Sequence, residues 1–146
     1  MNWNEYFFKM ADLVSEKSKD RSTKVGAVIV GPDHEVRSTG FNGFPRGVRD
    51  DVDARHERPA KYLWTEHAER NAVYNAARNG VHTFGTTMHL NCWWPCADCA
   101  RAIIQAGVAR VVVHASRVNA HDSRWSDSCA VGLEMLREAG VECVEE

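Results

Sequence analysis

Two short motifs hold residues that can bind a metal ion and move protons. His-Ala-Glu occupies residues 67–69, and Pro-Cys-Ala-Asp-Cys occupies residues 95–99, after a gap that fits one helix and one strand. Catalytic zinc commonly takes three His or Cys ligands and leaves a fourth position for water, whose pKa then falls toward neutrality. A carboxylate beside that water can carry its protons. The predicted residues are His67, Cys96 and Cys99 as metal ligands and Glu69 as the catalytic proton carrier.

The spacing of these motifs distinguishes several kinds of cysteine site. Cys-x-x-Cys alone also fits a structural zinc site or a redox pair. A structural site usually has a fourth His or Cys at close spacing, and none flanks His67. His-x-Glu followed by Pro-Cys-x-x-Cys is the signature of zinc deaminases. We therefore expect hydrolysis at an amidine-like carbon of a nucleobase, with Glu69 moving a proton from water to the ring nitrogen and the departing ammonia.

Helix geometry limits where these residues can meet. His67 and Glu69 are two positions apart, roughly 200° around a helix, so they converge only if the site lies at the helix tip. Thr65 is expected to cap this helix, which ends near residues 79–80. Pro95 suits the first position of the next helix, and Trp94 cannot cap it with its side chain. The free amides there would favour thiolates.

Hydrophobic patterns along the chain predict an α/β fold. A helix to about residue 18 precedes a hairpin, and helices then alternate with strands, which favours a mixed five-stranded sheet covered by helices. At 146 residues, the chain is expected to form one domain over residues 1–146. The expected later elements are strands 24–30 and 35–41, helix 65–79, strand 86–92, helix 96–106, strand 110–114, helix 126–139 and strand 141–144.

Residues 42–64 lack a regular apolar pattern. This segment contains Gly and Pro residues among five Lys or Arg side chains, so we expect a long, basic, functional loop.

Composition favours a small-molecule substrate. The formal charge is −2 and the pI is about 6.4, without the basic character of a typical nucleic-acid binder. We find no signal sequence and no apolar run long enough for a membrane span. The three cysteines outside the zinc motif show no paired framework. These features predict a soluble protein of the reducing cytoplasm.

Several sequence blocks together resemble the deoxycytidylate (dCMP) deaminases of the cytidine deaminase superfamily. The blocks lie at residues 18–30, 38–47, 67–72 and 95–108, so the resemblance covers nearly the whole chain. It implies a three-layer α/β/α cytidine deaminase-like domain with one catalytic Zn²⁺ per chain. It also implies conversion of dCMP to dUMP and ammonia, which supplies dUMP for thymidylate synthesis.

The resemblance also implies substrate contacts. Asn42 would contact the deoxyribose hydroxyl, and the backbone of Ala68 would help to hold the base. Independently of the resemblance, the aromatic faces of Trp93 and Trp94 suit a nucleobase, so we expect Trp94 to stack on the base. The 5′-phosphate would fall to the polar run before the first strand, where the candidates are Ser22, Lys24, Lys19 and Arg21.

Further implications concern regulation and assembly. The segment from Gly47 to Asp51 resembles in part the family's regulatory loop, which would allow a Mg²⁺-bound nucleotide effector. Regulated relatives are homohexamers, so we expect a homo-oligomer. The chain departs from the common family pattern at Trp93-Trp94, at Arg70, where an apolar residue is frequent, and at Val48, where Cys is frequent.

Alternative functions remain open from sequence. The same chemistry could act on dCTP, a 5-modified dCMP or a purine. A nucleic-acid editing deaminase is a second alternative, disfavoured by the acidic charge balance. A non-catalytic zinc-binding module is a third, in which Glu69 would have no chemical role.

Overall fold

The computed structural model describes residues 1–120 and 123–146 and contains one mixed five-stranded sheet. The strand order is β2-β1-β3-β4-β5, with antiparallel pairing of β1 to β2 and to β3 and parallel pairing of β3 to β4 and of β4 to β5. This arrangement confirms the predicted sheet and its opening hairpin. The strands are β1 (Gly26–Val30), β2 (Val36–Phe41), β3 (Thr87–Leu90), β4 (Arg110–Val113) and β5 (Glu142–Glu145).

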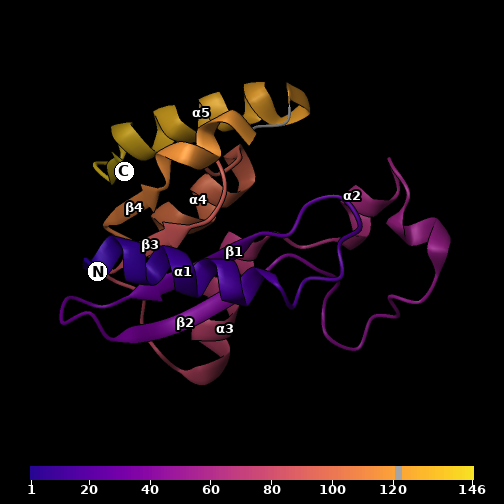
Figure 1. The fold of residues 1–146 in the computed structure, drawn as a ribbon, viewed down its shortest axis with the longest axis horizontal. Coiled ribbons are helices and arrows are strands. Elements are labelled where there is room, and N and C mark those ends of the chain that lie inside the picture. Colours follow the sequence, from indigo (N-terminus) through magenta and orange to yellow (C-terminus); the bar gives the residue numbers. More distant parts are fainter. Residues whose placement is uncertain (121–122) are drawn as a thin grey trace.

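Helices cover both faces of the sheet and give three layers (Figure 1). Side chains of β1 alternate between the faces, as a pleated strand requires. Val28 and Val30 pack against Phe7 of the first helix, whereas Ile29 belongs to the core beneath the other helices. The main helices are α1 (Trp3–Ser15), α3 (Ala68–Asn79), α4 (Ala97–Gln105) and α5 (Ser126–Glu138), and the short ones are α2 (Lys61–Trp64), η1 (Asp53–His56), η2 (Ala115–Ala120) and η3 (Ser123–Trp125).

Three predictions about helix ends were wrong. The first helix ends at Ser15 and not near residue 18. Thr65 does not cap α3: it is the residue that ends α2, and His67 occupies the N-cap of α3. Pro95 lies before α4, whose N-cap is Cys96, because Cys96 has an extended backbone (ψ 170°). The predicted end of this helix near residues 79–80 is confirmed, and Gly80 ends α3 in the left-handed conformation.

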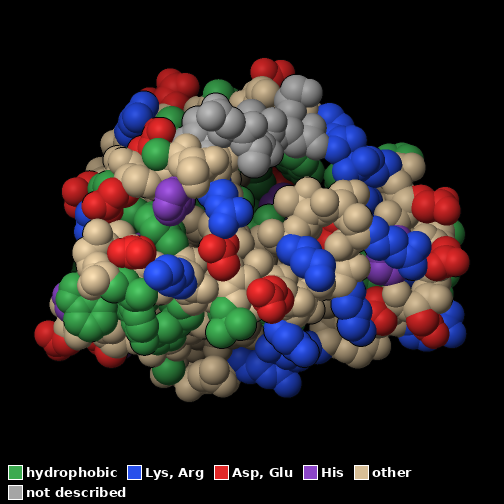
Figure 2. All heavy atoms as spheres, in the orientation of Figure 1, with side chains coloured by type: hydrophobic (Ala, Val, Ile, Leu, Met, Phe, Trp, Pro, Cys, Tyr) green, Lys and Arg blue, Asp and Glu red, His purple; other side chains and the backbone are tan. Residues whose placement is uncertain are grey.

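The segment 42–64 is more ordered and less basic than expected. It contains two short helices, η1 and α2, and its five Lys or Arg residues are accompanied by four Asp or Glu residues. Lys19 and Arg21 pair with Asp50 and Asp53 of this segment at 2.8 and 2.9 Å. Positive and negative side chains are interleaved on this side of the molecule (Figure 2). The segment is thus a long loop, as predicted, but it contains two short helices, and acidic side chains balance its basic ones.

Close packing of α3 on β2 sets the position of the helix tip. A Cβ at Gly40 would lie 2.3 Å from the backbone nitrogen of Ala72, so only glycine allows this approach. The hydroxyl of Ser38 donates to the carbonyl of Ala72 at 2.6 Å, and Asn75 donates to the carbonyl of Thr39 at 2.8 Å. These contacts fix the helix that carries two of the predicted functional residues.

No helix in the described part of the chain has both the length and the apolar character needed to cross a bilayer.

Candidate active site

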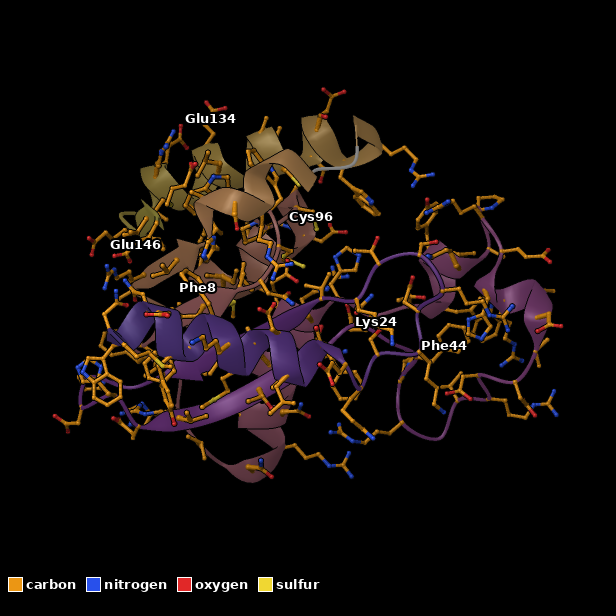
Figure 3. The ribbon with its side chains drawn as sticks, viewed as in Figure 1. Phe8, Lys24, Phe44, Cys96, Glu134 and Glu146 are labelled. Atoms are coloured by element: carbon orange, nitrogen blue, oxygen red, sulfur yellow. The ribbon has the colours of Figure 1, made fainter. Side chains whose placement is uncertain are left out.

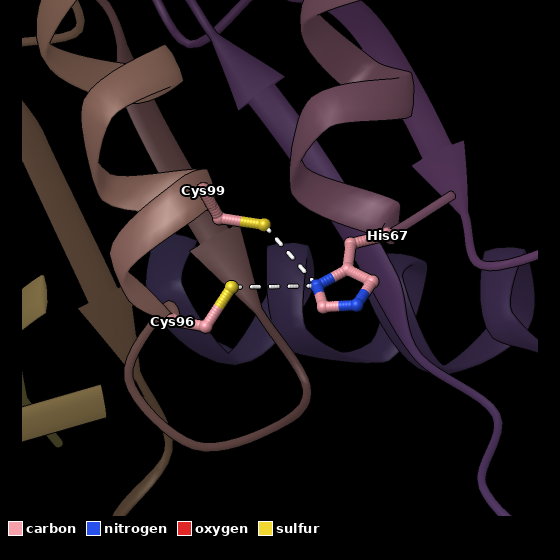
Figure 4. A group of neighbouring side chains, drawn as sticks. All are labelled: His67, Cys96 and Cys99. Atoms are coloured by element: carbon pink, nitrogen blue, oxygen red, sulfur yellow. Dashed lines mark hydrogen bonds between the residues drawn. The ribbon is translucent and has the colours of Figure 1, made fainter. Parts of the chain in front are cut away.

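His67, Cys96 and Cys99 form a compact cluster where the N-termini of α3 and α4 meet. One ligand atom from each of the three residues lies within 4.8 Å of the others. The Nδ1 atom of His67 is 3.5 Å from the Sγ of Cys96 and 3.4 Å from the Sγ of Cys99 (Figure 4). The structure thus brings together the three residues predicted as metal ligands, although they are separated by 29 and 32 positions along the chain.

The donor set and its spacing fit zinc. One imidazole nitrogen and two thiols are ligands that zinc accepts, and both cysteines are buried. Ordinary Zn–N and Zn–S distances place N and S about 3.6 Å apart in a tetrahedral site. The observed separations of 3.5 and 3.4 Å are close to that value. Three protein ligands leave the fourth position of a tetrahedral ion open, as in catalytic zinc sites.

A mutual hydrogen bond shifts the pKa values of the two thiols in opposite directions. A hydrogen bond from Cys99, aided by His67 and opposed by burial, lowers the pKa of Cys96 to about 4. The same hydrogen bond, together with burial, raises the pKa of Cys99. The hydrogen bond to Cys96 raises the pKa of His67, although burial opposes this. A bound cation is what would let both sulfurs be thiolates at once.

Glu69 lies beside the metal cluster in the first turn of α3. Its side chain is only 6% exposed and hydrogen bonds to Cys99. Burial raises the pKa of this carboxyl above its ordinary value. A carboxyl with a raised pKa can hold a proton near neutral pH and release it again. The expected meeting of His67 and Glu69 at a helix tip is observed, because His67 is the N-cap and Glu69 is the second residue of α3.

The cluster borders a cavity of about 200 Å³ whose lining has two chemically different parts. One part carries sulfur atoms and Glu69. The other, called the polar end here, carries hydroxyl and charged groups, among which Asp20 contacts Lys61, Ser22 and Thr23, and aromatic rings complete the lining. The aromatic lining is Tyr62, Trp93, Trp94 and Trp125, the cysteines are Cys92, Cys96 and Cys129, and the polar lining includes Asp20, Ser22, Thr23, Asn42, Arg58 and Lys61.

The structure brings some predicted substrate contacts to this cavity. Ser22, Asn42, Ala68 and Trp94 all line it. The side-chain amide of Asn42 also holds the loop before β1, because it donates to the carbonyl of Thr23 at 2.9 Å and accepts from the backbone of residue 25 at 2.8 Å. Asn42 therefore shapes the polar end as well as bordering it.

Other predicted contacts lie elsewhere. Lys19, Arg21 and Lys24 do not line the cavity, and Lys19 and Arg21 point their charges at acidic partners in the segment 42–64. Lys24 is exposed on the segment that leads into β1, whereas Cys96 lies at the start of α4 (Figure 3). Gly47 and Asp51 are also exposed, and a Cβ at Gly47 would meet open space within the described part of the chain.

Sequence reasoning missed two cations of the cavity. Arg58 and Lys61 line its polar end, and Lys61 pairs with the nearly buried Asp20 at 3.1 Å. Asp20 also accepts the backbone N–H groups of Ser22 and Thr23. Burial opposes ionisation of Asp20, but these hydrogen bonds and Lys61 lower its pKa overall. Arg58 lies in the turn before α2, so no helical spacing relates it to Lys61. The sequence signal was only that both residues belong to the segment 42–64 predicted as a basic, functional loop, which singles out neither of them.

The C-terminal helix supports the metal cluster. The hydroxyl of Ser128 accepts the backbone N–H of Ala97 at 3.0 Å, so one of the amides predicted to be free at the start of α4 is occupied. Trp125 meets the ring of His67 edge to face at 5.4 Å. Cys129 also borders the cavity, so the cysteines outside the zinc motif are less scattered in space than in sequence. Nothing in the sequence pattern indicated these contacts.

Comparisons with known proteins agree with this geometry. Residues 1–115 match the family model of the cytidine and deoxycytidylate deaminase zinc-binding region. The chain belongs to this deaminase family. Membership confirms the predicted fold class and the prediction that the chain is an enzyme, and it supports zinc at the cluster of His67 and the two cysteines.

Individual relatives cover most of the chain. An uncharacterized deaminase in the luxG 3′ region of Aliivibrio fischeri is 42% identical over 96% of this chain and 90% of its own length. The deoxycytidylate deaminase of Homo sapiens is 35% identical over 97% of this chain and 78% of its own. A dCMP deaminase from the cyanophage S-TIM5, solved in complex with dCMP and dUMP, is 28% identical with a TM-score of 0.77, covering 97% of this chain and 95% of its own.

Proposed function

We propose that this deaminase converts dCMP to dUMP and ammonia. The observation that carries the proposal is one cavity lined both by the metal cluster with Glu69 and by Arg58, Lys61 and Ser22. A nucleotide needs the same two kinds of group, a reactive centre for the amino group of its base and cations for its phosphate. The similarity to deoxycytidylate deaminases, one of them solved with dCMP and dUMP, supports the pyrimidine deoxynucleotide.

The chain's own groups divide the work of the reaction. His67, Cys96 and Cys99 would hold zinc, which when bound supplies a Lewis acid that makes water reactive at neutral pH. Glu69 accepts one proton from the attacking water and gives it to the ring nitrogen. It then carries the second proton of that water from the new hydroxyl group to the amine, which leaves as ammonia while the oxygen stays on the ring carbon. Because Glu69 is buried, its carboxyl is shielded from bulk solvent. The raised pKa of this carboxyl suits a group that must accept and release a proton in one cycle.

The walls and the polar end orient the nucleotide. Trp94 and Ala68 both line the cavity, where the indole ring would stack on the base and the backbone of Ala68 would help to hold it. Asn42 borders the region where a sugar would lie. Lys61 and Arg58, with the hydroxyl of Ser22, provide the cationic and donor groups that a phosphate prefers.

The same proposal includes a cellular setting. We place the enzyme in the cytoplasm as a single domain that supplies dUMP for thymidylate synthesis, and its five unpaired cysteines suit a reducing compartment. We also propose a homo-oligomer, with a hexamer as the form that the resemblance to regulated relatives implies, and exposed aromatic side chains such as Trp3 and Phe84 suit such an interface. A Mg²⁺-bound nucleotide effector would act through the loop from Gly47 to Asp51.

A substrate panel tests the proposal. Ammonia release is measured for zinc-quantified protein with dCMP, CMP, dCTP, 5-methyl-dCMP, deoxycytidine and guanine, each with and without Mg-dCTP or Mg-dTTP. We expect the highest kcat/KM for dCMP and a large loss when its phosphate is removed. Preference for deoxycytidine over dCMP, or turnover of guanine alone, would overturn the substrate assignment.

A further inference from the structure

Arg70 lies between the two chain segments that supply the metal ligands. It follows Glu69 directly, and its side chain is 18% exposed. Its Nε donates to the carboxylate of Glu66, and its Nη1 is 3.5 Å from a carboxylate oxygen of Asp98. One guanidinium thus contacts acidic groups on both sides of the cluster.

Each acidic partner is tied to a metal ligand. The carboxylate of Glu66 that receives Arg70 also accepts the backbone N–H of His67 at 2.9 Å. Asp98 lies between Cys96 and Cys99 in the first turn of α4. The path Glu66–Arg70–Asp98 therefore runs from the turn that carries His67 to the turn that carries the two cysteines.

We propose that Arg70 is a positioning residue that holds these two turns in register and thereby tightens zinc binding. The proposal rests on the zinc site of the proposed function. The ligands come from separate helices, so the metal must otherwise meet the entropic cost of fixing both turns itself. Groups that orient metal ligands from outside the coordination sphere commonly contribute 10-fold to 100-fold in metal affinity. The guanidinium also places a positive charge beside two sulfurs that zinc binds as thiolates.

If Arg70 served only as a local ion pair with Glu66, its loss would change the stability of the fold and not the affinity for zinc. The pair Glu66–Arg70 is four residues apart, and such helix pairs contribute about 0.3–0.5 kcal/mol to stability without any link to metal. Glu66, however, lies outside α3, whose N-cap is His67, and Arg70 reaches a second acid on another helix. A local pair would change thermal stability equally with and without zinc. A bridge between ligand turns changes zinc affinity.

The test measures zinc affinity by competition with a chromogenic chelator. Arg70→Leu should bind zinc about 10-fold to 100-fold more weakly than the parent protein. Arg101→Leu is the matched control, because Arg101 also pairs with Asp98 but is 58% exposed and makes that pair within α4 alone. We expect its affinity to stay within about twofold of the parent, as for an exposed ion pair. Arg70→Lys should recover part of the loss, because lysine keeps the positive charge but lacks the planar guanidinium whose separate nitrogens contact Glu66 and Asp98.

A second readout reports coordination directly. Cobalt-substituted Arg70→Leu should show altered d–d and thiolate-to-cobalt absorption bands, while Arg101→Leu keeps those of the parent. Equal zinc affinity and equal cobalt spectra in Arg70→Leu and the parent would overturn the proposal, as would an equal loss in both Leu variants. If the parent itself binds no zinc, the proposed function fails, a result distinguishable from failure of Arg70 alone.

Discussion

Acid should destabilise this protein through His89, a buried histidine on the face of β3 that packs against α1. Its side chain is 3% exposed and contacts the rings of Phe7 and Phe8 at 4.9 and 5.7 Å. Nε2 is 2.8 Å from the Oδ1 of Asn4, so that nitrogen carries the proton, and Nδ1 has no partner in the described chain. Burial, with smaller effects from Arg110 and His34, lowers the pKa of His89 to about 4.

The direction of the pH effect follows from this lowered value. In the unfolded chain His89 returns to its ordinary pKa of 6.5 and therefore binds a proton more readily than in the folded protein. Acid thus favours unfolding. The contribution of His89 to the free energy of unfolding is highest above pH 6.5 and decreases as the pH falls toward 4. We expect His89 to lower the free energy of unfolding by about 2 kcal/mol between about pH 7 and about pH 5.

A ring without a titrating group provides the comparison. His89→Phe should fill similar space between the two phenylalanines and lose about 1 kcal/mol with the hydrogen bond to Asn4. Urea unfolding of both zinc-replete proteins is measured at the two pH values. The difference between their changes in the free energy of unfolding reports on His89 alone, because the other groups titrate equally in the two proteins. The parent should lose more stability on acidification than His89→Phe by about 2 kcal/mol. Equal losses in the two proteins would refute the reasoning.

Two further predictions concern packing and substrate. Gly40→Ala should destabilise the fold by about 1–3 kcal/mol, because its Cβ would meet the backbone of Ala72, whereas Gly43→Ala has its nearest neighbour at 4.0 Å and should have a smaller effect in the same urea titration. Equal effects would contradict this packing argument. Arg58→Met should raise KM for dCMP about 10-fold or more while leaving KM for deoxycytidine nearly unchanged, as expected for loss of a charged phosphate contact. Lys61 is left in place because its charge also balances that of Asp20. An equal rise for both substrates in steady-state assays would instead indicate a general change in the pocket.

The zinc chemistry and the layered fold could be predicted because both follow from the spacing of residues over short stretches of the sequence. The spacing of His67, Glu69 and the Cys-x-x-Cys pair specifies zinc hydrolysis, and strands that alternate with helices specify a layered sheet. Gly80 marks a helix end by its own conformational freedom.

The polar end of the cavity could not be predicted in the same way. Lys24 and Lys61 are both single lysines in irregular stretches, and sequence alone gives no reason to choose between them. Only the fold brings Lys61 against Asp20 and leaves Lys24 exposed. Trp125 reaches the ring of His67 from a segment 58 positions later, and no local pattern encodes such a contact.

The most direct test of the central claim is the turnover of dCMP by zinc-replete Glu69→Gln. Glutamine keeps the shape of the side chain but cannot accept and return protons as a carboxyl does. Zinc content should match the parent protein, and dUMP formation should fall by at least about 10³-fold. A variant that retains zinc and still converts dCMP at a substantial fraction of the parent rate would contradict the account.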